Sequence, residues 1–135
     1  MGKISSVLAA VVAALSACSS LGGGRRLSRG PEIPAAEGTV RFVRIAGDDT
    51  GIELNVRHLA EPDLLLPPGY VYVAWVRAAR ETPPQNVGAL ELGADLNGVL
   101  RTTTPLRRFE LFVTAEATRD AAQPAGPHLL WASRD

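Results

Sequence analysis

The chain has 135 residues, which suits one domain and is too short for two substantial ones. Its 14 basic and 14 acidic residues cancel at pH 7, and this balance argues against a nucleic-acid partner, whose binding normally requires a surplus of positive charge. A single cysteine excludes an internal disulfide and metal sites built on paired cysteines, and two histidines provide little material for a zinc site. We therefore expect neither a metal ion nor another cofactor. The 13 glycines and 10 prolines favour short strands and turns over a helical bundle.

Residues 1–18, MGKISSVLAAVVAALSAC, have the three parts of a secretory signal. Lys3 and the terminal amine are positive, residues 7–15 form an apolar run, and small residues precede Cys18. The apolar run is shorter than the roughly 20 residues that a membrane-spanning helix needs. The sequence LSAC, residues 15–18, resembles the lipobox of bacterial lipoproteins. This resemblance implies a helical signal peptide that ends before Cys18, with acylation of the Cys18 thiol and of its new amine.

An acylated Cys18 would anchor the protein to a membrane, since more than one acyl chain is needed for stable anchoring. The alternatives are an ordinary signal peptide that contains a cysteine, or a buried helix. Ser19 and Ser20 follow the cysteine instead of aspartate, and the resemblance to bacterial lipoproteins then implies export to the outer membrane if the host is Gram-negative. We therefore expect a lipid-anchored protein of the bacterial cell envelope, with the membrane as its partner.

Residues 18–37 contain the acylated cysteine and connect it to the remainder of the chain. They are rich in glycine, serine, proline and alanine and show no periodic apolar pattern, which predicts a flexible linker with a reach of roughly 20–25 Å. Arg25, Arg26 and Arg29 would each add about 1 kcal/mol of attraction to anionic lipid, or would only keep the linker soluble.

Residues 38–135 alternate between strand and turn patterns. Residues 51–59 place apolar side chains at every second position, which is typical of a half-buried antiparallel strand. Residues 39–46 are also β-prone, and the sequence GDDTG that separates the two segments predicts a hairpin. The inward side chains are Ile52, Leu54 and Val56.

Residues 70–78 are apolar on both faces, as expected of a central strand. The preceding residues 60–69 contain three prolines and cannot form a central strand, so we expect leucines 64 to 66 to cover an open end of the core. The spacing of strands and turns predicts an all-β fold, a single immunoglobulin-like antiparallel β-sandwich of about seven strands over residues 38–135, with no helix. The other expected strands are 86–93, 98–104, 107–117, with Phe109, Leu111 and Val113 on one side, and 128–133.

Four segments, YVYVAWVR, NVGALEL, FVTAEAT and PAGPHLL, occur in an order that resembles the extracytoplasmic domain of anti-sigma-K-factor-type proteins. The resemblance covers residues 70–132 and implies a sandwich fold. The family's cytoplasmic sigma-binding domain and transmembrane helix have no counterpart here, so no sigma factor is expected as a partner. The matching positions are Tyr72, Trp75, Gly88, Leu90, Val113, Thr114, Glu116, Pro124, Gly126 and Pro127.

Few polar residues are placed for metal binding. Asp48 and Asp49 lie in an acidic turn of the kind that sometimes binds calcium, but further ligands are lacking and a solvated turn is expected. His58 either continues the inward series of its strand or lies at the strand end, and His128 lies among prolines near the C-terminus. Both histidines are expected to be structural.

The sequence also offers little for catalysis. Ser28 and Ser133 lack the Gly-x-Ser-x-Gly turn that a serine nucleophile often uses. A pair of carboxylates for sugar hydrolysis could come from three glutamates, but all three are expected at outward strand positions. They are Glu91, Glu110 and Glu116. We therefore expect a protein that is not an enzyme.

Most of the aromatic surface comes from two tryptophans and two tyrosines. Trp75 lies on the expected central strand and is predicted to occupy the sandwich core, while Tyr70 and Tyr72 point to the opposite face. These tyrosines are a candidate surface for a partner or a glycan. Because both faces of one strand cannot lie in one core, one aromatic set must be covered by a loop, by the sequence DLLLP, or by a partner. The second tryptophan, Trp131, belongs to the closing strand.

Two functions of different classes follow. The first is a lipid-anchored, non-enzymatic interaction or structural module of the cell envelope that meets another envelope protein. The second is a lipoprotein that binds a carbohydrate or a small molecule through an aromatic face. Exposure of Tyr70 and Tyr72 in a concave surface would favour ligand binding, and a flat or buried arrangement would favour the interaction module.

Overall fold

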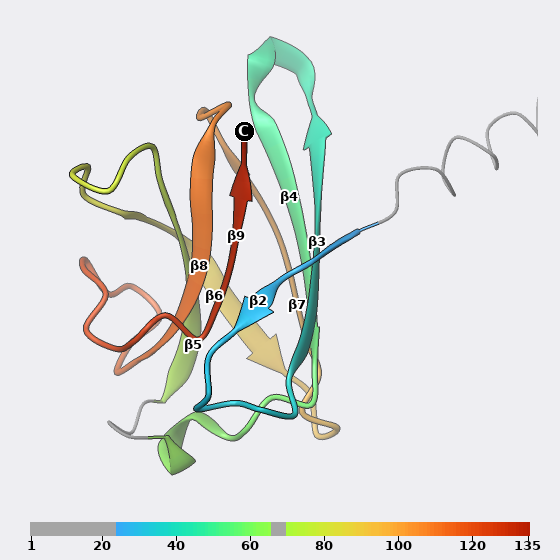
Figure 1. Cartoon of the computed structure of the whole chain (residues 1–135), viewed down its shortest axis with the longest axis vertical. Coiled ribbons are helices and arrows are strands. Elements are labelled where there is room, and N and C mark those ends of the chain that lie inside the picture. Colours follow the sequence, from blue (N-terminus) through green and yellow to red (C-terminus); the bar gives the residue numbers. More distant parts are fainter. Residues whose placement is uncertain (1–23, 66–69) are drawn as a thin grey trace, which may run out of the picture.

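The computed structural model describes residues 24–65 and 70–135, and this part of the chain is all β (Figure 1). Two short 3-10 turns, Ala46–Asp48 and Pro62–Leu64, interrupt the strands, and no α-helix occurs among the described residues. Within these ranges no helix is long and apolar enough to cross a membrane. The strands are β1 (Arg25–Arg26), β2 (Ser28–Arg29), β3 (Glu37–Arg44), β4 (Thr50–Arg57), β5 (Val71–Arg77), β6 (Gln85–Leu92), β7 (Gly98–Thr104), β8 (Phe109–Glu116) and β9 (Leu130–Arg134).

The nine strands form one antiparallel sheet in the order β1-β3-β4-β7-β6-β5-β8-β9-β2. β6 joins the two halves of the sheet, because most of its length pairs with β5 while Glu91 and Leu92 pair with β7. A bulge between β5 and β6 beside Gly88, at φ 136°, bends β6 from one half toward the other. The sheet wraps around one interior and is nearly a barrel (Figure 1). The all-β antiparallel prediction is confirmed, with nine strands in one nearly closed sheet where about seven strands were expected in a sandwich.

Residues 24–37 belong to the fold, so the flexible linker expected over residues 18–37 is wrong for this part. β1 pairs with β3 and, one residue later, β2 pairs with β9, so the segment bridges the two edge strands (Figure 1). Leu27 between them is buried, as are Ile33 and Ala36 in the turns that follow. The composition predicts a linker here, but a few buried apolar side chains are enough to hold the segment on the sheet, since burial of one leucine or isoleucine contributes about 1.5–3 kcal/mol.

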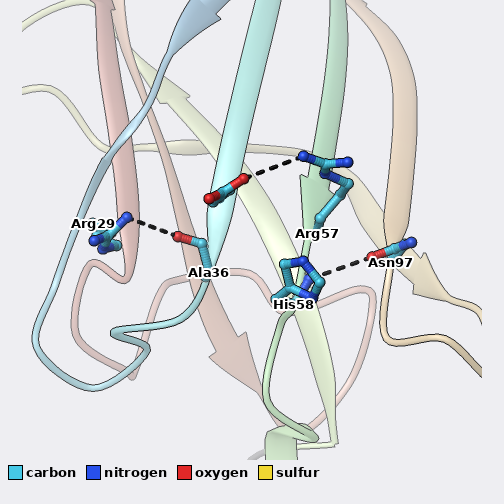
Figure 2. A network of polar contacts seen from close by, with 6 residues as sticks. Arg29, Ala36, Arg57, His58 and Asn97 are labelled. Atoms are coloured by element: carbon cyan, nitrogen blue, oxygen red, sulfur yellow. Dashed lines mark hydrogen bonds and ion pairs between the residues drawn. The ribbon is translucent and has the colours of Figure 1, made fainter.

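Polar contacts hold the return of this segment to β3. Figure 2 shows Arg29 directed toward Ala36, whose carbonyl oxygen accepts a hydrogen bond from Arg29 Nη1 at 3.2 Å. At the start of β3, Glu37 accepts a hydrogen bond from Arg57 Nη2 at 3.2 Å. Both side chains of this ion pair are more than half exposed, so it contributes less than about 1 kcal/mol. The buried apolar side chains therefore supply most of the stability of the bridge.

The expected hairpin is confirmed as β3 and β4, which pair from Glu37–Arg57 to Arg44–Thr50. The three inward side chains of β4 are at most 1% exposed, while Asn55 and Arg57 are exposed. The other strands start and end within two residues of the expected positions, and 98–104 matches β7. Inward side chains from both halves of the sheet meet in one core. Its largest members include Ile52, Leu54, Tyr72, Leu90, Leu111 and Leu130.

β5 is buried on both faces, as predicted, but the faces have the opposite roles from those expected. Tyr72 lies in the main core and its hydroxyl donates a hydrogen bond to the Ala60 carbonyl at 2.5 Å. Burial raises the pKa of Tyr72 to about 12. Trp75 is also fully buried, but on the outer face, in a second cluster with Val73 and Phe112. Trp75 is therefore not the centre of the main core.

The leucines expected to cover an open end of the core divide between two environments. Leu65 is buried against the main cluster, whereas Leu64 is 72% exposed. Leu66 lies outside the described residues. One leucine of the three is thus shown to cover the core, as predicted.

Candidate binding site on the outer face of β5, β8 and β9

Strand register places two rows of side chains side by side on the outer face of β5, β8 and β9. Alternate residues of a strand share a face, so directly paired residues and those two positions away form a continuous surface. One row is aromatic and the next is polar. The aromatic row is Trp75, Phe112 and Trp131, and the polar row is Arg77, Glu110 and Ser133.

The loop between β8 and β9 covers one end of the aromatic row. Ala121 packs against the cluster that contains Trp75, and the Asn86 amide donates hydrogen bonds to the carbonyls of Arg119 and Ala121 at 3.0 Å each. The Trp75 indole N–H donates to Thr114 Oγ1 at 2.9 Å. A loop therefore covers the second aromatic face, one of the three coverings that the sequence left open.

Glu116 holds this loop against the sheet. It lies on the outer face of β8, as expected, but it is buried because the loop covers it. Its carboxylate accepts hydrogen bonds from the Ala125 N–H at 3.0 and 3.1 Å and from the Gly126 N–H at 3.4 Å. Thr114 Oγ1 donates to the same carboxylate. The chain folds back over the sheet immediately after β8, and this return encloses a residue that strand alternation alone does not predict to be buried.

The loop leaves the other end of the aromatic row open. Trp131 is 36% exposed, although its neighbours Leu130 and Ala132 are buried on the inner face of β9. Beside it lies an open depression of about 540 Å³, a volume typical of small-molecule sites. It is lined by Arg77, Arg80, Glu110, His128, Trp131 and Ser133.

Charges in the depression are only partly compensated. Arg77 Nη2 lies 3.1 Å from Glu110 Oε1, with both side chains mostly buried. The Arg77 guanidinium carbon also lies 5.1 Å from the centre of the Phe112 ring, within cation–π range. Arg77 Nε is buried without a hydrogen-bond partner, and Arg80 has no ion pair among the described residues. Two arginines against one glutamate leave the site positive.

His128 forms one wall of the depression. Its ring stacks on Phe112, with 3.9 Å between ring centres and 15° between planes, and its Nδ1 lies 3.7 Å from Glu110 Oε1. Burial and the neighbouring Arg77 lower the pKa of His128, while Glu110 opposes this effect. A neutral, stacked imidazole at pH 7 is consistent with the structural role predicted for this histidine.

The geometry suits binding better than catalysis. Ser133 lies on the regular strand β9, with no hydrogen bond to His128 in the described part of the chain, and a serine nucleophile needs such a base. Glu110 is engaged by Arg77, and its distance to His128 exceeds hydrogen-bonding range. A partly exposed indole beside Arg80, which has no ion pair among the described residues, can hold a ligand by its apolar face and its anion.

The other predicted residues lie away from this site. Asp48 pairs with Arg107 at 2.8 Å in an exposed turn, and Asp49 is half-buried. Across residues 24–65 and 70–135, no three histidine, cysteine, aspartate or glutamate side chains form a group suited to a metal ion. His58 is exposed at the end of β4, where its backbone N–H donates to Asn97 Oδ1 at 3.3 Å (Figure 2). Ser28 lies in β2.

The expected surface of Tyr70 and Tyr72 does not form as a pair. Tyr70 is 81% exposed, whereas Tyr72 is completely buried because its face of β5 is the one that enters the main core. Glu91 is exposed, as predicted, and pairs with Arg119 at 3.1 Å. Cys18, the predicted acylation site, lies outside the described residues.

Sequence reasoning did not identify Arg77, Arg80 or the exposure of Trp131 as parts of a site. The signal that could have found them is the pairing of β8 with both β5 and β9, which brings residues more than fifty positions apart into one row. Searches against protein-family models, curated proteins and solved structures find no match for this chain. The site is therefore interpreted from its own residues.

Proposed function

We propose that this chain is a lipid-anchored, non-enzymatic protein of the bacterial cell envelope whose β-domain is an interaction module. Its anchor is the acylated Cys18, and its location is the outer membrane if the host is Gram-negative. The observation that carries this proposal is the short distance between the lipobox-like sequence and the folded domain. β1 begins at Arg25, seven residues after Cys18.

This spacing would keep the domain close to the membrane. Six Cα steps separate Cys18 from Gly24, and an extended chain spans at most about 3.6 Å per residue, so the domain begins within about 22 Å of the lipid. The expected linker to residue 37 would have allowed greater freedom. A domain held so near the surface suits contact with a neighbouring envelope protein, which we propose as its partner.

A second function, ligand binding, is favoured by the exposed Trp131 beside the positive depression. The two functions are compatible, because an interaction module can hold its partner through such a site. We do not propose a catalytic role, since Glu110 and His128 are engaged in packing and ion pairing and Ser133 has no activating base.

We also propose that residues 70–132 are related in fold to the sandwich of anti-sigma-K-factor-type proteins, without sigma-factor binding. In support, several of the matching positions act together in this structure. Trp75 donates to Thr114, Thr114 donates to Glu116, and Glu116 accepts the N–H of Gly126. Together, these contacts between the matching positions hold the β8–β9 loop over the outer aromatic cluster.

Fractionation of cells that express the full chain tests the anchor. We expect the wild type to sediment with membranes and Cys18→Ser to remain in the soluble fraction or as an uncleaved precursor. Ser20→Ala is the matched control, since it changes a neighbouring small residue and leaves LSAC intact. Identical fractionation of the wild type and Cys18→Ser would overturn the proposal.

A further inference from the structure

We propose that the depression on β5, β8 and β9 binds an anionic saccharide, with a pyranose ring against Trp131 and a carboxylate or phosphate on Arg80 and Arg77. This inference rests on the proposed ligand-binding role of the depression and is independent of the lipid anchor. The ligand class follows from three features of the site: an aromatic platform, two arginine side chains of which Arg80 has no ion pair among the described residues, and a hydrogen-bonding row.

The aromatic platform is Trp131. It is held by pairing on both sides, to Phe112 of β8 and to Ser28 of β2, so its backbone is fixed before any ligand arrives. The exposed part of the indole can therefore pack against the apolar C–H face of a pyranose at little entropic cost. Trp75 and Phe112 in the same row are covered by the loop and by His128, so Trp131 is the member of this row that lines the depression.

The cationic donors select for negative charge. Arg80 is exposed, lies in the loop after β5 and has no ion pair among the residues that the structure describes. Arg77 lines the depression and is oriented by Glu110 and by the Phe112 ring. Arginine binds carboxylate and phosphate oxygens through paired N–H donors. The anion of the ligand is therefore expected at the arginine end of the depression.

The polar row explains why a saccharide fits better than a purely apolar anion. Besides Arg77, the row contributes the Glu110 carboxylate and the Ser133 hydroxyl, and the neighbouring neutral His128 contributes a ring nitrogen. Hydroxyl groups of a sugar can donate to the carboxylate and exchange hydrogen bonds with the hydroxyl and the ring nitrogen. An acid without hydroxyl groups would leave this row unpaired.

Four probes separate the two parts of the proposed ligand. Glucuronate and glucose 6-phosphate carry both ring and anion, glucose carries the ring alone, and acetate carries the anion alone. The two indole N–H signals of full-length Cys18→Ser protein, labelled with ¹⁵N, report on Trp131 in the site and on Trp75 beneath the loop. The Trp131 signal is assigned with Trp131→Phe.

We expect both charged sugars to move the Trp131 signal with millimolar dissociation constants, as suits a single ring, and glucose to bind at least about fivefold more weakly. The stronger of the two charged sugars identifies the anion. Arg80→Ala is expected to remove the preference for charged sugars, and the control Arg101→Ala, on β7 in the other half of the sheet, to leave it unchanged. Trp131→Ala is expected to weaken binding at least about tenfold.

Equal affinity for glucose and glucuronate would overturn the anionic part of the proposal, and acetate shifts as large as those of glucuronate would overturn the saccharide part. No shift of the Trp131 signal up to about 50 mM sugar would overturn both. Arg80 is an exposed loop residue, so its variant keeps the test decisive if Trp131→Ala fails to fold. The Cys18→Ser protein used for this experiment cannot be acylated at residue 18. A negative binding result is therefore distinct from failure of the lipid-anchor proposal.

Discussion

Replacement of Glu116 by glutamine tests how the β8–β9 loop is held over the sheet. The carboxylate is 4% exposed and accepts hydrogen bonds from the N–H groups of Ala125 and Gly126 and from the Thr114 hydroxyl. Glutamine preserves the shape but replaces one acceptor oxygen by a donor that faces existing donors. Hydrogen bonds to a charged group contribute about 1.5–3 kcal/mol, and an unpaired buried donor costs a similar amount, so we expect a loss of about 2 kcal/mol.

Urea unfolding, monitored by tryptophan fluorescence, measures this loss as a lower midpoint with an unchanged slope. Glu91→Gln is the control, because Glu91 is exposed and its ion pair with Arg119 contributes less than about 1 kcal/mol. Amide exchange should also become faster in residues 117–128 than in the hairpin of β3 and β4. A loss for Glu116→Gln no larger than that of Glu91→Gln would refute the view that this carboxylate anchors the loop.

Three further predictions concern other parts of the domain. Leu27→Ala is expected to lower the free energy of unfolding by about 2 kcal/mol in urea, because it removes the buried side chain that holds the bridge between β3 and β9. An unchanged free energy of unfolding would mean that this segment is not packed against the sheet. The raised pKa of Tyr72 means that the folded state keeps the phenol proton to a higher pH than the unfolded chain does. The free energy of unfolding should therefore fall as pH rises from about 10 to about 12, and Tyr72→Phe should lack this part of the alkaline loss. The lowered pKa of His128 means that, as pH falls, the unfolded chain binds a proton before the folded protein does. The stability contributed by the neutral, packed imidazole is therefore present above about pH 6.5 and is lost as pH falls below it. An NMR titration of the imidazole with a midpoint at or above 6.5 would contradict the packing seen here.

Much of the fold could be predicted because local pattern determines it. The alternation of Ile52, Leu54 and Val56 predicts β4 and its buried face, and the turn residues beside it predict the hairpin. The doubly apolar pattern of residues 71–77 predicts that β5 is covered on both sides. Local pattern does not show which face of β5 meets the larger core. Tyr72 therefore lies in the main core and Trp75 on the outer face, the reverse of the prediction.

The rest depends on contacts between distant residues. The composition of residues 24–37 predicts a linker, although Leu27 and Ile33 are buried once β3 and β9 provide edges to pair with. Glu116 looks outward by strand alternation and becomes buried only because the following loop folds back over it. The depression likewise requires the register of β8 with both of its neighbours, which no single segment encodes.

The central claim, a binding domain held at the membrane by lipid on Cys18, is tested most directly by the intact mass and N-terminal peptide of the mature protein. We predict a mature chain that begins at Cys18 and carries acyl chains on its thiol and amine. In Cys18→Ser the modified peptide should be absent. A wild-type chain that is uncleaved, or cleaved elsewhere without acylation, would contradict the account.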